Sequence, residues 1–313
     1  MDTLKENLSQ ALGDKLETNV LLSKYSTIDV GGICDYFFTA ESIEDLVRSV
    51  NVAYENKIPF MILGWGSNIV VSDFGFPGLV IKNNSSGIVI NTDGCEVIVD
   101  SGLGISKLLA MVASNDLGGL EFMSGIPGTV GGAIYGNSGS KNYSISDYIK
   151  NVTLLELVAD NLVLRSHDRE WMEFEHRSSK IKEMNKTGGF KPIILTARFR
   201  LTPKRKEEIL NSMQENLAEK RVGQPLGEKS AGCFFKNLGF VPEQAAGYLL
   251  DKSGAKKLRV GDARVSKKHA NFIINSGKAS AKDIRKLAKK AADLVEDNFK
   301  IKLEEEIEYV GKW

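Results

Sequence analysis

The sequence feature that most constrains the fold is the glycine-rich segment 124–139, which reads SGIPGTVGGAIYGNSG. Six of its sixteen residues are glycine and one is proline. We therefore expect neither an ordinary helix nor a long strand, because each interior glycine costs about 1 kcal/mol relative to alanine. Glycine also lets main-chain N–H groups approach a ligand, which suits the pyrophosphate of an anionic cofactor. A series of structural turns explains such a loop equally well in isolation.

A second loop of similar chemistry, residues 64–68, reads GWGSN and follows a strand predicted over 59–63. Its main-chain N–H groups, its hydroxyl and its side-chain amide are suited to phosphate oxygens. The residues that follow, 69–71, are strand-like, and the third glycine of the Rossmann fingerprint is missing. The pattern therefore disfavours a classical dinucleotide fold and indicates anion binding in another fold.

Composition excludes several classes of partner. The 313 residues are 42% hydrophobic and 26% charged, which is typical of a globular protein with two or three domains. The 41 basic side chains balance 40 acidic ones, so we expect neither nucleic acid nor an acidic membrane surface as partner.

Neither a metal site nor a disulfide framework is indicated. The cysteines show no Cys-x-x-Cys spacing, and the histidines are scattered. These residues are Cys34, Cys95, Cys233, His167, His176 and His269. No apolar run approaches the roughly 18 residues that span a bilayer, and residues 1–14 lack the apolar core of a signal peptide. We therefore expect a cytoplasmic protein.

Periodicity predicts mixed helices and strands, an α+β protein. Helices are expected at 2–12, from 42, and at 106–115, 204–220, 242–253 and 280–298. Strands are expected at 34–38, 59–63, 69–71, 78–82, 87–90, 96–100, 152–156, 191–200 and 301–310. Composition changes at Thr202, where a charged helix is predicted to connect to another domain.

Four motifs together resemble the UDP-N-acetylenolpyruvoylglucosamine reductase family. They are LGWGSN at 63–68, SGIPGTVGGAIYGN at 124–137, SAGCFFKN at 230–237 and LEEE at 303–306. The resemblance runs from about residue 26 to 311. It implies a two-subdomain FAD-binding fold of the vanillyl-alcohol oxidase type, 1–75 and 76–201, and a C-terminal α+β substrate-binding domain at 202–313.

The resemblance also implies a reaction. NADPH reduces FAD, and the reduced flavin delivers hydride to the enolpyruvyl ether of a UDP-sugar to give UDP-N-acetylmuramate. This small-molecule reaction belongs to peptidoglycan precursor synthesis, and so to cell wall biogenesis, cell shape and cell division. The oligomeric state stays open, and a monomer is compatible with the sequence. The cofactor-binding residues implied are Gly64, Gly66, Ser67, Asn68, Ser124, Gly125, Ile126, Pro127, Gly128, Thr129, Gly131, Gly132, Ala133 and Asn137.

Two catalytic residues follow from motifs of the family. Arg177 lies in the segment His176-Arg177-Ser178-Ser179, which resembles a loop motif of the family, and would hold the substrate carboxylate as a two-pronged donor. Glu306 matches the terminal acid of the family. On an alternating strand Glu304 and Glu308 face the same way, so periodicity alone does not choose Glu306. Arg221, Gln224, Lys236 and Asn237 lie in segments that resemble substrate-binding ones, and Lys267, Lys268, His269 and Asn271 lie in one that resembles a supporting segment.

Cys233 is the most informative departure from the family. Most relatives carry serine there, and its hydroxyl is the proposed proton donor to the substrate carbanion. A thiol, with a pKa near 8.5, is a stronger acid and can do the same job. A buried structural cysteine is the alternative. A histidine at 176 replaces the usual tyrosine. One subgroup of the family carries an extra substrate-capping tyrosine loop, for which the short segment 178–190 leaves little room, so the resemblance favours the second subgroup, which lacks that loop.

Two other functions remain open at this point. A flavin oxidase of the same fold, acting on an alcohol or lactone, would share both glycine loops but lack Arg177, Cys233 and Glu306 in their motifs. A non-catalytic FAD- or nucleotide-binding regulator would also keep the loops. A colourless preparation that takes up no FAD would exclude every flavin-based interpretation.

Overall fold

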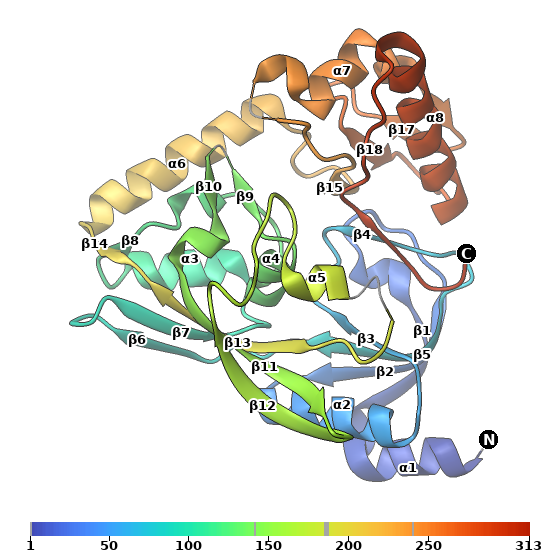
Figure 1. Cartoon of the computed structure of the whole chain (residues 1–313). Coiled ribbons are helices and arrows are strands. Elements are labelled where there is room, and N and C mark those ends of the chain that lie inside the picture. The colour runs from blue at the N-terminus through green and yellow to red at the C-terminus, as the bar shows by residue number, and fades with distance from the viewer. Residues whose placement is uncertain (1, 141, 185–187, 240) are drawn as a thin grey trace. The chain divides into compact units, whose positions relative to one another are not determined.

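The computed structural model describes residues 2–140, 142–184, 188–239 and 241–313 (Figure 1). The chain forms two compact units. Unit 1 contains residues 1–17, 38–64 and 80–219, and unit 2 contains residues 18–37, 65–79 and 220–313. The sequence predicts three domains with other boundaries, 1–75, 76–201 and 202–313, and this division stays a prediction.

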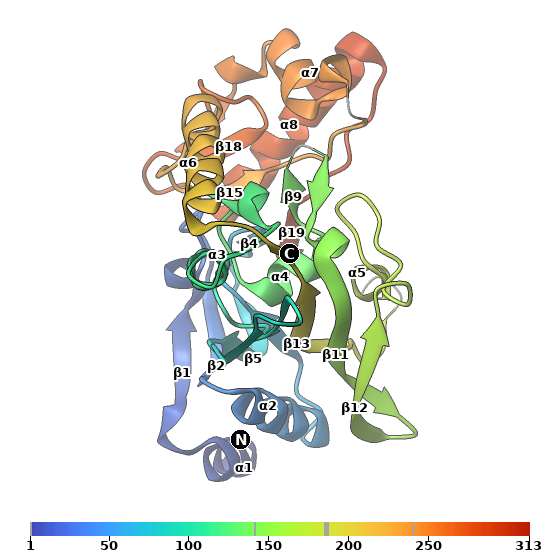
Figure 2. The same cartoon turned by 90° about the vertical axis from the view of Figure 1, so that its left-hand side faces the viewer.

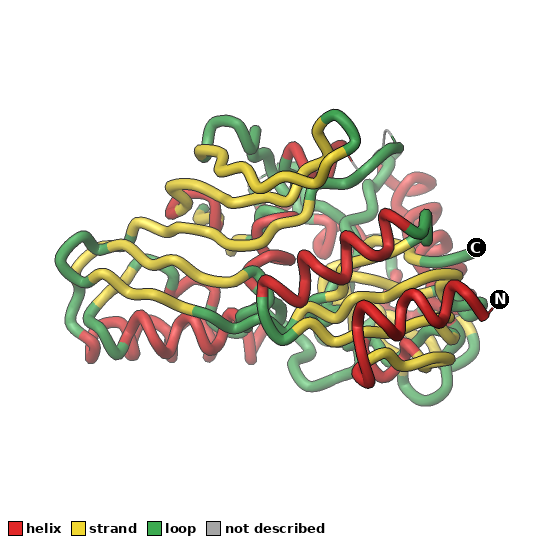
Figure 3. Tube along the Cα trace, turned by 90° about the horizontal axis from the view of Figure 1, so that it is seen from below, coloured by secondary structure: helices red, strands yellow, loops and turns green. Residues whose placement is uncertain are grey.

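Helices and strands both occur along the chain, as the colours in Figure 3 show, which agrees with the α+β expectation. The helices are α1 (Asp2–Leu12), α2 (Ile43–Glu55), α3 (Ile105–Ala113), α4 (Val130–Tyr135), α5 (Lys180–Met184), α6 (Lys206–Gly223), α7 (Ala246–Lys252) and α8 (Ala281–Phe299). The strands are β1 (Leu16–Leu21), β2 (Ile33–Ala40), β3 (Phe60–Leu63), β4 (Ile69–Val71), β5 (Phe76–Asn83), β6 (Ile88–Asn91), β7 (Glu96–Asp100), β8 (Leu117–Gly118), β9 (Gly139–Ser140), β10 (Tyr143–Ser144), β11 (Ile149–Val158), β12 (Asn161–Asp168), β13 (Ile193–Arg200), β14 (Thr202–Pro203), β15 (Ser230–Cys233), β16 (Arg259–Val260), β17 (Ala263–Val265), β18 (Phe272–Asn275) and β19 (Glu308–Val310).

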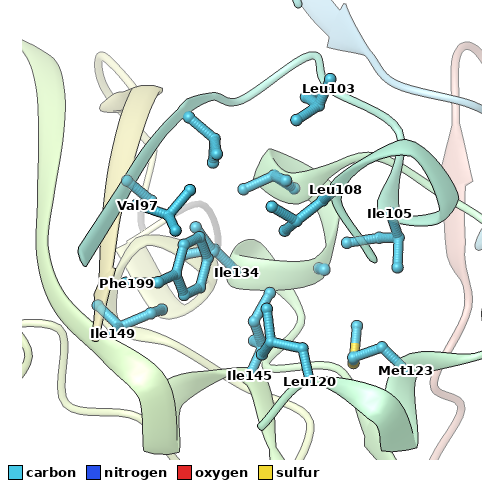
Figure 4. Close-up of a cluster of buried hydrophobic side chains, with 14 of the residues drawn as sticks. Val97, Leu103, Ile105, Leu108, Leu120, Met123, Ile134, Ile145, Ile149 and Phe199 are labelled. Carbon is cyan, nitrogen blue, oxygen red and sulfur yellow. The ribbon is translucent and has the colours of Figure 1, made fainter. Parts of the chain in front are cut away.

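Unit 1 is built on an antiparallel sheet in the order β12-β11-β13-β7-β6. The long strands β11 and β12 run side by side in Figure 2. Helices α3 and α4 bury their apolar side chains against this sheet, where Phe199 of β13 and Ile134 of α4 are both fully buried (Figure 4). This core holds in place the glycine-rich segment that contains α4.

Local capping fixes the start of α2 as the sequence predicts. The Ser42 hydroxyl accepts a hydrogen bond from the N–H of Asp45 at 3.1 Å. Side chains at Leu46, Val50 and Ala53 then recur at helical spacing and are fully buried.

A four-stranded sheet has the order β1-β2-β5-β3. The chain passes between the two units within β1, β2 and β5. Strand β3 leads directly to Gly64, the first residue of the second glycine loop.

Unit 2 contains a sheet in the order β15-β18-β17-β16, and α7 and α8 pack with it around one core (Figure 1). Ser280 and Asp283 form a capping box at the start of α8. The Asp73 carboxylate also accepts hydrogen bonds from the N–H groups of Ala281 and Lys282, at 2.8 and 3.0 Å. Both devices favour helix initiation, since they satisfy N–H groups that have no partner within a helix.

Two secondary-structure predictions are wrong. Segment 124–139 contains the short helix α4, because Thr129 caps it and distant carbonyls accept its first N–H groups. Residues 301–310 are not one continuous strand. Strand β19 covers only Glu308–Val310, and the main chain of residues 304–306 bonds to residues 234–236 instead. Among the described helices none has the length and apolar character needed to cross a membrane.

Candidate active site

The glycine-rich segment in unit 1 forms a tight loop followed by α4. Gly125 and Gly128 have φ of 78° and 141°, which only glycine adopts readily. Thr129 then caps α4, and its hydroxyl accepts the N–H of Gly132 at 3.3 Å. The sequence composition thus shapes the loop before the helix.

The N–H groups of this segment indicate where an anion fits. Those of Val130 and Gly131, at the start of α4, donate to the carbonyls of Leu103 and Ser101 at 2.9 and 2.7 Å. Within the described part of the chain, the N–H groups of Gly125 and Gly128 have no protein acceptor. Gly125 is exposed and Gly128 half-buried, so the loop rather than the helix fits the diphosphate of a dinucleotide.

The first glycine of the second loop meets this segment within unit 1. A Cβ added to Gly64 would lie 2.8 Å from the Thr129 hydroxyl. The Lys82 ammonium donates a hydrogen bond to the Gly64 carbonyl, and burial lowers the pKa of Lys82. Sequence reasoning missed Lys82; its signal is a lysine at the end of the predicted apolar strand 78–82.

Gly131 and Gly132 differ in what their lack of a side chain permits. A Cβ on Gly131 would lie 2.9 Å from the Ser101 Cβ, so this glycine allows close packing inside the protein. A Cβ on the exposed Gly132 would meet only the Thr129 hydroxyl, at 3.6 Å. Packing therefore explains Gly131, whereas Gly132 leaves room for a ligand. Ser124 and Ala133 are buried, Pro127 is exposed and Ile126 is half-buried.

Arg177 lies in a two-residue turn of unit 1. Glu175 and Ser178 exchange main-chain hydrogen bonds at 3.1 and 3.2 Å, and Arg177 between them has φ of 58°. Its guanidinium donates to the carbonyls of Gly139 at 2.9 Å and Asn137 at 3.5 Å. The half-buried guanidinium is thus held in one orientation, as recognition of a carboxylate requires.

Cys233 lies in unit 2 at an irregularity of the β15–β18 pairing. The register shifts between Ser230 and Cys233, and Gly232 has φ of 83°. The Thr27 hydroxyl donates to the Ser230 carbonyl at 2.7 Å and fixes the start of this strand. Such bulges redirect side chains and are common beside active sites. The Cys233 side chain is half-buried, so it is not a fully buried structural cysteine.

Glu306 is bonded to the segment that carries Cys233. The Glu306 N–H donates to the carbonyl of Phe234 at 2.8 Å, and Lys236 N–H donates to the carbonyl of Glu304 at 2.9 Å. The segments around Cys233 and Glu306 therefore lie side by side within unit 2, although more than seventy positions separate them in the sequence.

The neighbouring glutamates have other partners. The Glu304 carboxylate pairs with Lys236 at 2.6 Å, and the Glu305 carboxylate accepts the Tyr309 hydroxyl at 2.9 Å. Glu304 and Glu305 are exposed, whereas Glu306 is half-buried. Burial thus distinguishes Glu306 from these two neighbours, but not from Glu308, which is also half-buried.

The remainder of the second glycine loop, residues 66–68, belongs to unit 2. Gly66 has φ of 62°, and a Cβ there would overlap the Tyr25 carbonyl. Asn68 donates from its side chain to the Glu306 carbonyl at 3.1 Å. The half-buried Ser67 lies beside Gly232, whose added Cβ would be 3.9 Å from the Ser67 carbonyl. This loop therefore adjoins the segments that carry the candidate residues Cys233 and Glu306 in unit 2.

The predicted substrate-binding residues are placed in different surroundings within unit 2. Arg221 and Asn237 are exposed, and Gln224 and Lys236 are half-buried. The Asn237 side chain accepts the N–H of Ala246, the first residue of α7, at 3.0 Å. Asn237 thus helps to fix the start of α7.

Asn271 is hydrogen-bonded to the segment that follows Cys233. Its side chain exchanges two hydrogen bonds with the main chain of Phe235, at 2.8 and 2.9 Å, and it is 2% exposed. The N–H of Asn271 donates to Nδ1 of His269 at 3.2 Å. Burial, with the nearby charge of Lys256, lowers the pKa of His269, which favours the neutral form of the ring.

The structure places the catalytic candidates in different units: Arg177 belongs to unit 1, and Cys233 and Glu306 belong to unit 2. The contacts described for Arg177 therefore lie within unit 1, and those described for Cys233 and Glu306 lie within unit 2. In the described ranges, no cluster of three or more His, Cys, Asp or Glu side chains could hold a metal ion.

Two parts of the chain match models of known protein families. Residues 34–161 match the family model of an FAD binding domain, so the chain is a flavoprotein, in agreement with the loop geometry. Residues 224–310 match the model "UDP-N-acetylenolpyruvoylglucosamine reductase, C-terminal domain". The chain belongs to the UDP-N-acetylenolpyruvoylglucosamine reductase family.

Full-length relatives support this assignment. The reductase of Carboxydothermus hydrogenoformans is 37% identical over 309 residues, covering 99% of this chain and 98% of the relative. That of Clostridium novyi is 36% identical over 300 residues, with 96% and 93% covered. The crystal structure of UDP-N-acetylenolpyruvylglucosamine reductase from Thermus caldophilus has a TM-score of 0.75 and 34% identity, covering 93% of this chain and 97% of that one. The predicted family, α+β flavoenzyme fold and FAD cofactor are confirmed.

Proposed function

We propose that this protein reduces UDP-N-acetylenolpyruvoylglucosamine to UDP-N-acetylmuramate with NADPH, in peptidoglycan precursor synthesis. The observation that carries the proposal is the likeness to reductases over 99% of the chain. The pairing of the Cys233 and Glu306 segments within unit 2 supports it, since both candidate acids then lie on adjoining main-chain segments.

FAD, when bound and reduced by NADPH, supplies the hydride that adds to the vinylic methylene of the substrate. Negative charge then accumulates on the adjacent carbon and its carboxylate. We propose that the Arg177 guanidinium binds this carboxylate and that Glu306 assists as the terminal acid. The Cys233 thiol donates its proton to the adjacent carbon, forming the new C–H bond, and the thiolate recovers a proton from solvent.

Cofactor binding is proposed for both glycine loops. In unit 1 the N–H groups of Gly125 and Gly128 are suited to the diphosphate, and Gly132 leaves room for a ligand. The wider proposed set is Gly64, Gly66, Ser67, Asn68, Ser124, Ile126, Pro127, Thr129, Gly131 and Ala133. Asn137 was predicted with this set, and its contacts favour another role, argued below.

Substrate binding is proposed for the C-terminal part of the chain. A local group of basic side chains suits the two phosphates of a UDP-sugar. The residues proposed are Arg221, Gln224, Lys236 and Asn237.

We also propose the predicted division into domains at 1–75, 76–201 and 202–313. The proposed location is the cytoplasm, where NADPH and nucleotide sugars are available.

The experiment compares NADPH oxidation by the purified, yellow protein with and without UDP-N-acetylenolpyruvoylglucosamine. We expect rapid oxidation only with this substrate, and UDP-N-acetylmuramate as the product. A flavin oxidase would instead consume oxygen with an alcohol or lactone and ignore the UDP-sugar. A yellow protein that does neither would support a non-catalytic regulator and overturn the proposal.

A further inference from the structure

The turn that carries Arg177, residues 175–178, adopts a conformation that its sequence does not favour. Arg177 occupies the second position of a two-residue turn with φ of 58°, where glycine or asparagine is usual. An arginine persists there only when its surroundings hold it. Contacts from elsewhere in unit 1 must therefore hold this turn.

Asn137 provides them from a distant part of unit 1. Its Nδ2 donates to the carbonyl of Glu175 at 2.8 Å, directly at the start of the turn. Its own carbonyl accepts the Arg177 guanidinium at 3.5 Å, and the carbonyl of Gly139 accepts it at 2.9 Å. One residue therefore bonds both to the turn's main chain and to the side chain that the turn presents.

Asn137 is itself fixed by the core of unit 1. Its Oδ1 accepts the N–H of Ser146 at 3.4 Å, and the residue is only 5% exposed. Its φ of 42° lies in the left-handed region, which asparagine tolerates better than most side chains. Both ends of the amide thus contact the protein's own main chain.

We propose that Asn137 is a positioning residue for Arg177 and not a ligand of the flavin. This inference rests on the proposed function, because it assigns Arg177 to the substrate carboxylate. If Arg177 acts only after the flavin is reduced, Asn137 affects only that later half of the reaction. A flavin ligand would instead change FAD affinity or flavin reduction by NADPH.

The test measures both half-reactions by stopped flow, and FAD affinity by titration, in Asn137→Gly. Glycine keeps the left-handed backbone accessible and removes only the amide. Asn137→Asp is the second variant; it keeps the size of the side chain and removes the Nδ2 donor, should the glycine variant fold poorly. Either variant should slow flavin reoxidation by substrate about tenfold and leave FAD affinity and NADPH-driven flavin reduction within about twofold of the parent.

A double-mutant cycle with Arg177→Ala makes the test specific. Arg177→Ala should slow reoxidation by about 100- to 1,000-fold, as expected for the loss of one charge-stabilising group. In that background Asn137→Gly should cost less than about twofold more, because the side chain it positions is gone. Asn83→Ala is the matched control. Asn83 is equally buried, and its amide bonds to Ser85 and Ser101 at 2.8 Å, so its effect should be the same in both backgrounds.

The outcomes separate the two ideas. Equal effects of Asn137→Gly with and without Arg177, or a loss of FAD affinity, would overturn the positioning role while leaving the proposed reaction intact. An Arg177→Ala variant that reoxidises as fast as the parent would instead overturn the role proposed for Arg177, and the inference with it.

Discussion

The side-chain amide of Asn68 donates a hydrogen bond to the main-chain carbonyl of Glu306 at 3.1 Å, across 238 positions of sequence. The N–H of Glu308 donates back to the carbonyl of Asn68 at 3.0 Å, and the strands that follow, β4 and β19, pair in parallel. A residue of the second glycine loop thus fixes the main chain at the proposed terminal acid.

Asn68→Ala should therefore impair catalysis through Glu306. Loss of one hydrogen bond worth about 1 kcal/mol corresponds to about a fivefold slower flavin reoxidation by the UDP substrate. Asn298→Ala is the control, because it removes an exposed side-chain bond to the Leu294 carbonyl on α8. Stopped-flow reoxidation that is equally fast in Asn68→Ala and the control would contradict this role.

Cys233→Ala should remove the proton donor. We expect reoxidation by substrate to fall by about 100- to 10,000-fold, the usual contribution of general acid catalysis. Cys233→Ser should recover most of the rate, since a hydroxyl can donate at the same position. Both variants should keep their yellow colour and normal reduction by NADPH. Equal turnover of Cys233→Ala and the parent would eliminate Cys233 as the donor.

Gly132→Ala should have opposite effects on the stability of the apoprotein and on the affinity for FAD. The added Cβ fits the protein, so α4 should gain about 0.5–1 kcal/mol in the free energy of unfolding of the apoprotein. The same methyl group should weaken FAD binding if the flavin approaches this exposed glycine. Gly131→Ala is the comparison, because it should destabilise the apoprotein through contact with Ser101. Unchanged FAD affinity in Gly132→Ala would remove this residue from the cofactor site.

The stability of unit 2 should depend on pH through His269. Burial and the charge of Lys256 lower the pKa of His269 from 6.5, and Asp251 opposes them only in part. Below pH 6.5 the unfolded chain binds a proton that the folded chain resists, so the free energy of unfolding falls as pH decreases. The slope from this group is at most about 1.4 kcal/mol per pH unit.

Urea unfolding between pH 7.5 and 5.0 measures this slope. His269→Gln should reduce it, whereas Phe272→Leu, which trims a ring 5.1 Å from that of His269, should lower stability at every pH without removing the slope. An identical pH dependence in His269→Gln and the parent would exclude His269 as its source.

The sequence predicts those parts of the fold that depend on neighbouring residues. Ser42 and Ser280 mark the starts of α2 and α8 because a hydroxyl caps the N–H three residues later. The glycines of segment 124–139 likewise predict a loop shaped by its backbone. Helix α4 within it was missed, because its first N–H groups depend on the distant carbonyls of Leu103 and Ser101.

The site residues likewise depend on contacts between segments that are distant in the sequence. The family motifs indicate Arg177, Cys233 and Glu306, yet no local pattern reveals that Glu306 bonds to Phe234 or that Asn137 bonds to the turn of Arg177. Periodicity predicts one strand at 301–310 and leaves Glu304, Glu306 and Glu308 equivalent. Burial distinguishes Glu306, which is half-buried, from Glu304 and Glu305, which are exposed.

The most direct test of the central claim is anaerobic reoxidation of the reduced enzyme. The FAD-loaded protein is first bleached with one equivalent of NADPH and then mixed with UDP-N-acetylenolpyruvoylglucosamine, while absorbance near the oxidised-flavin maximum is followed. We predict that the yellow colour returns and that one UDP-N-acetylmuramate forms per flavin. A flavin that stays reduced with this substrate, and turns yellow only when oxygen is admitted, would contradict the assignment as a reductase.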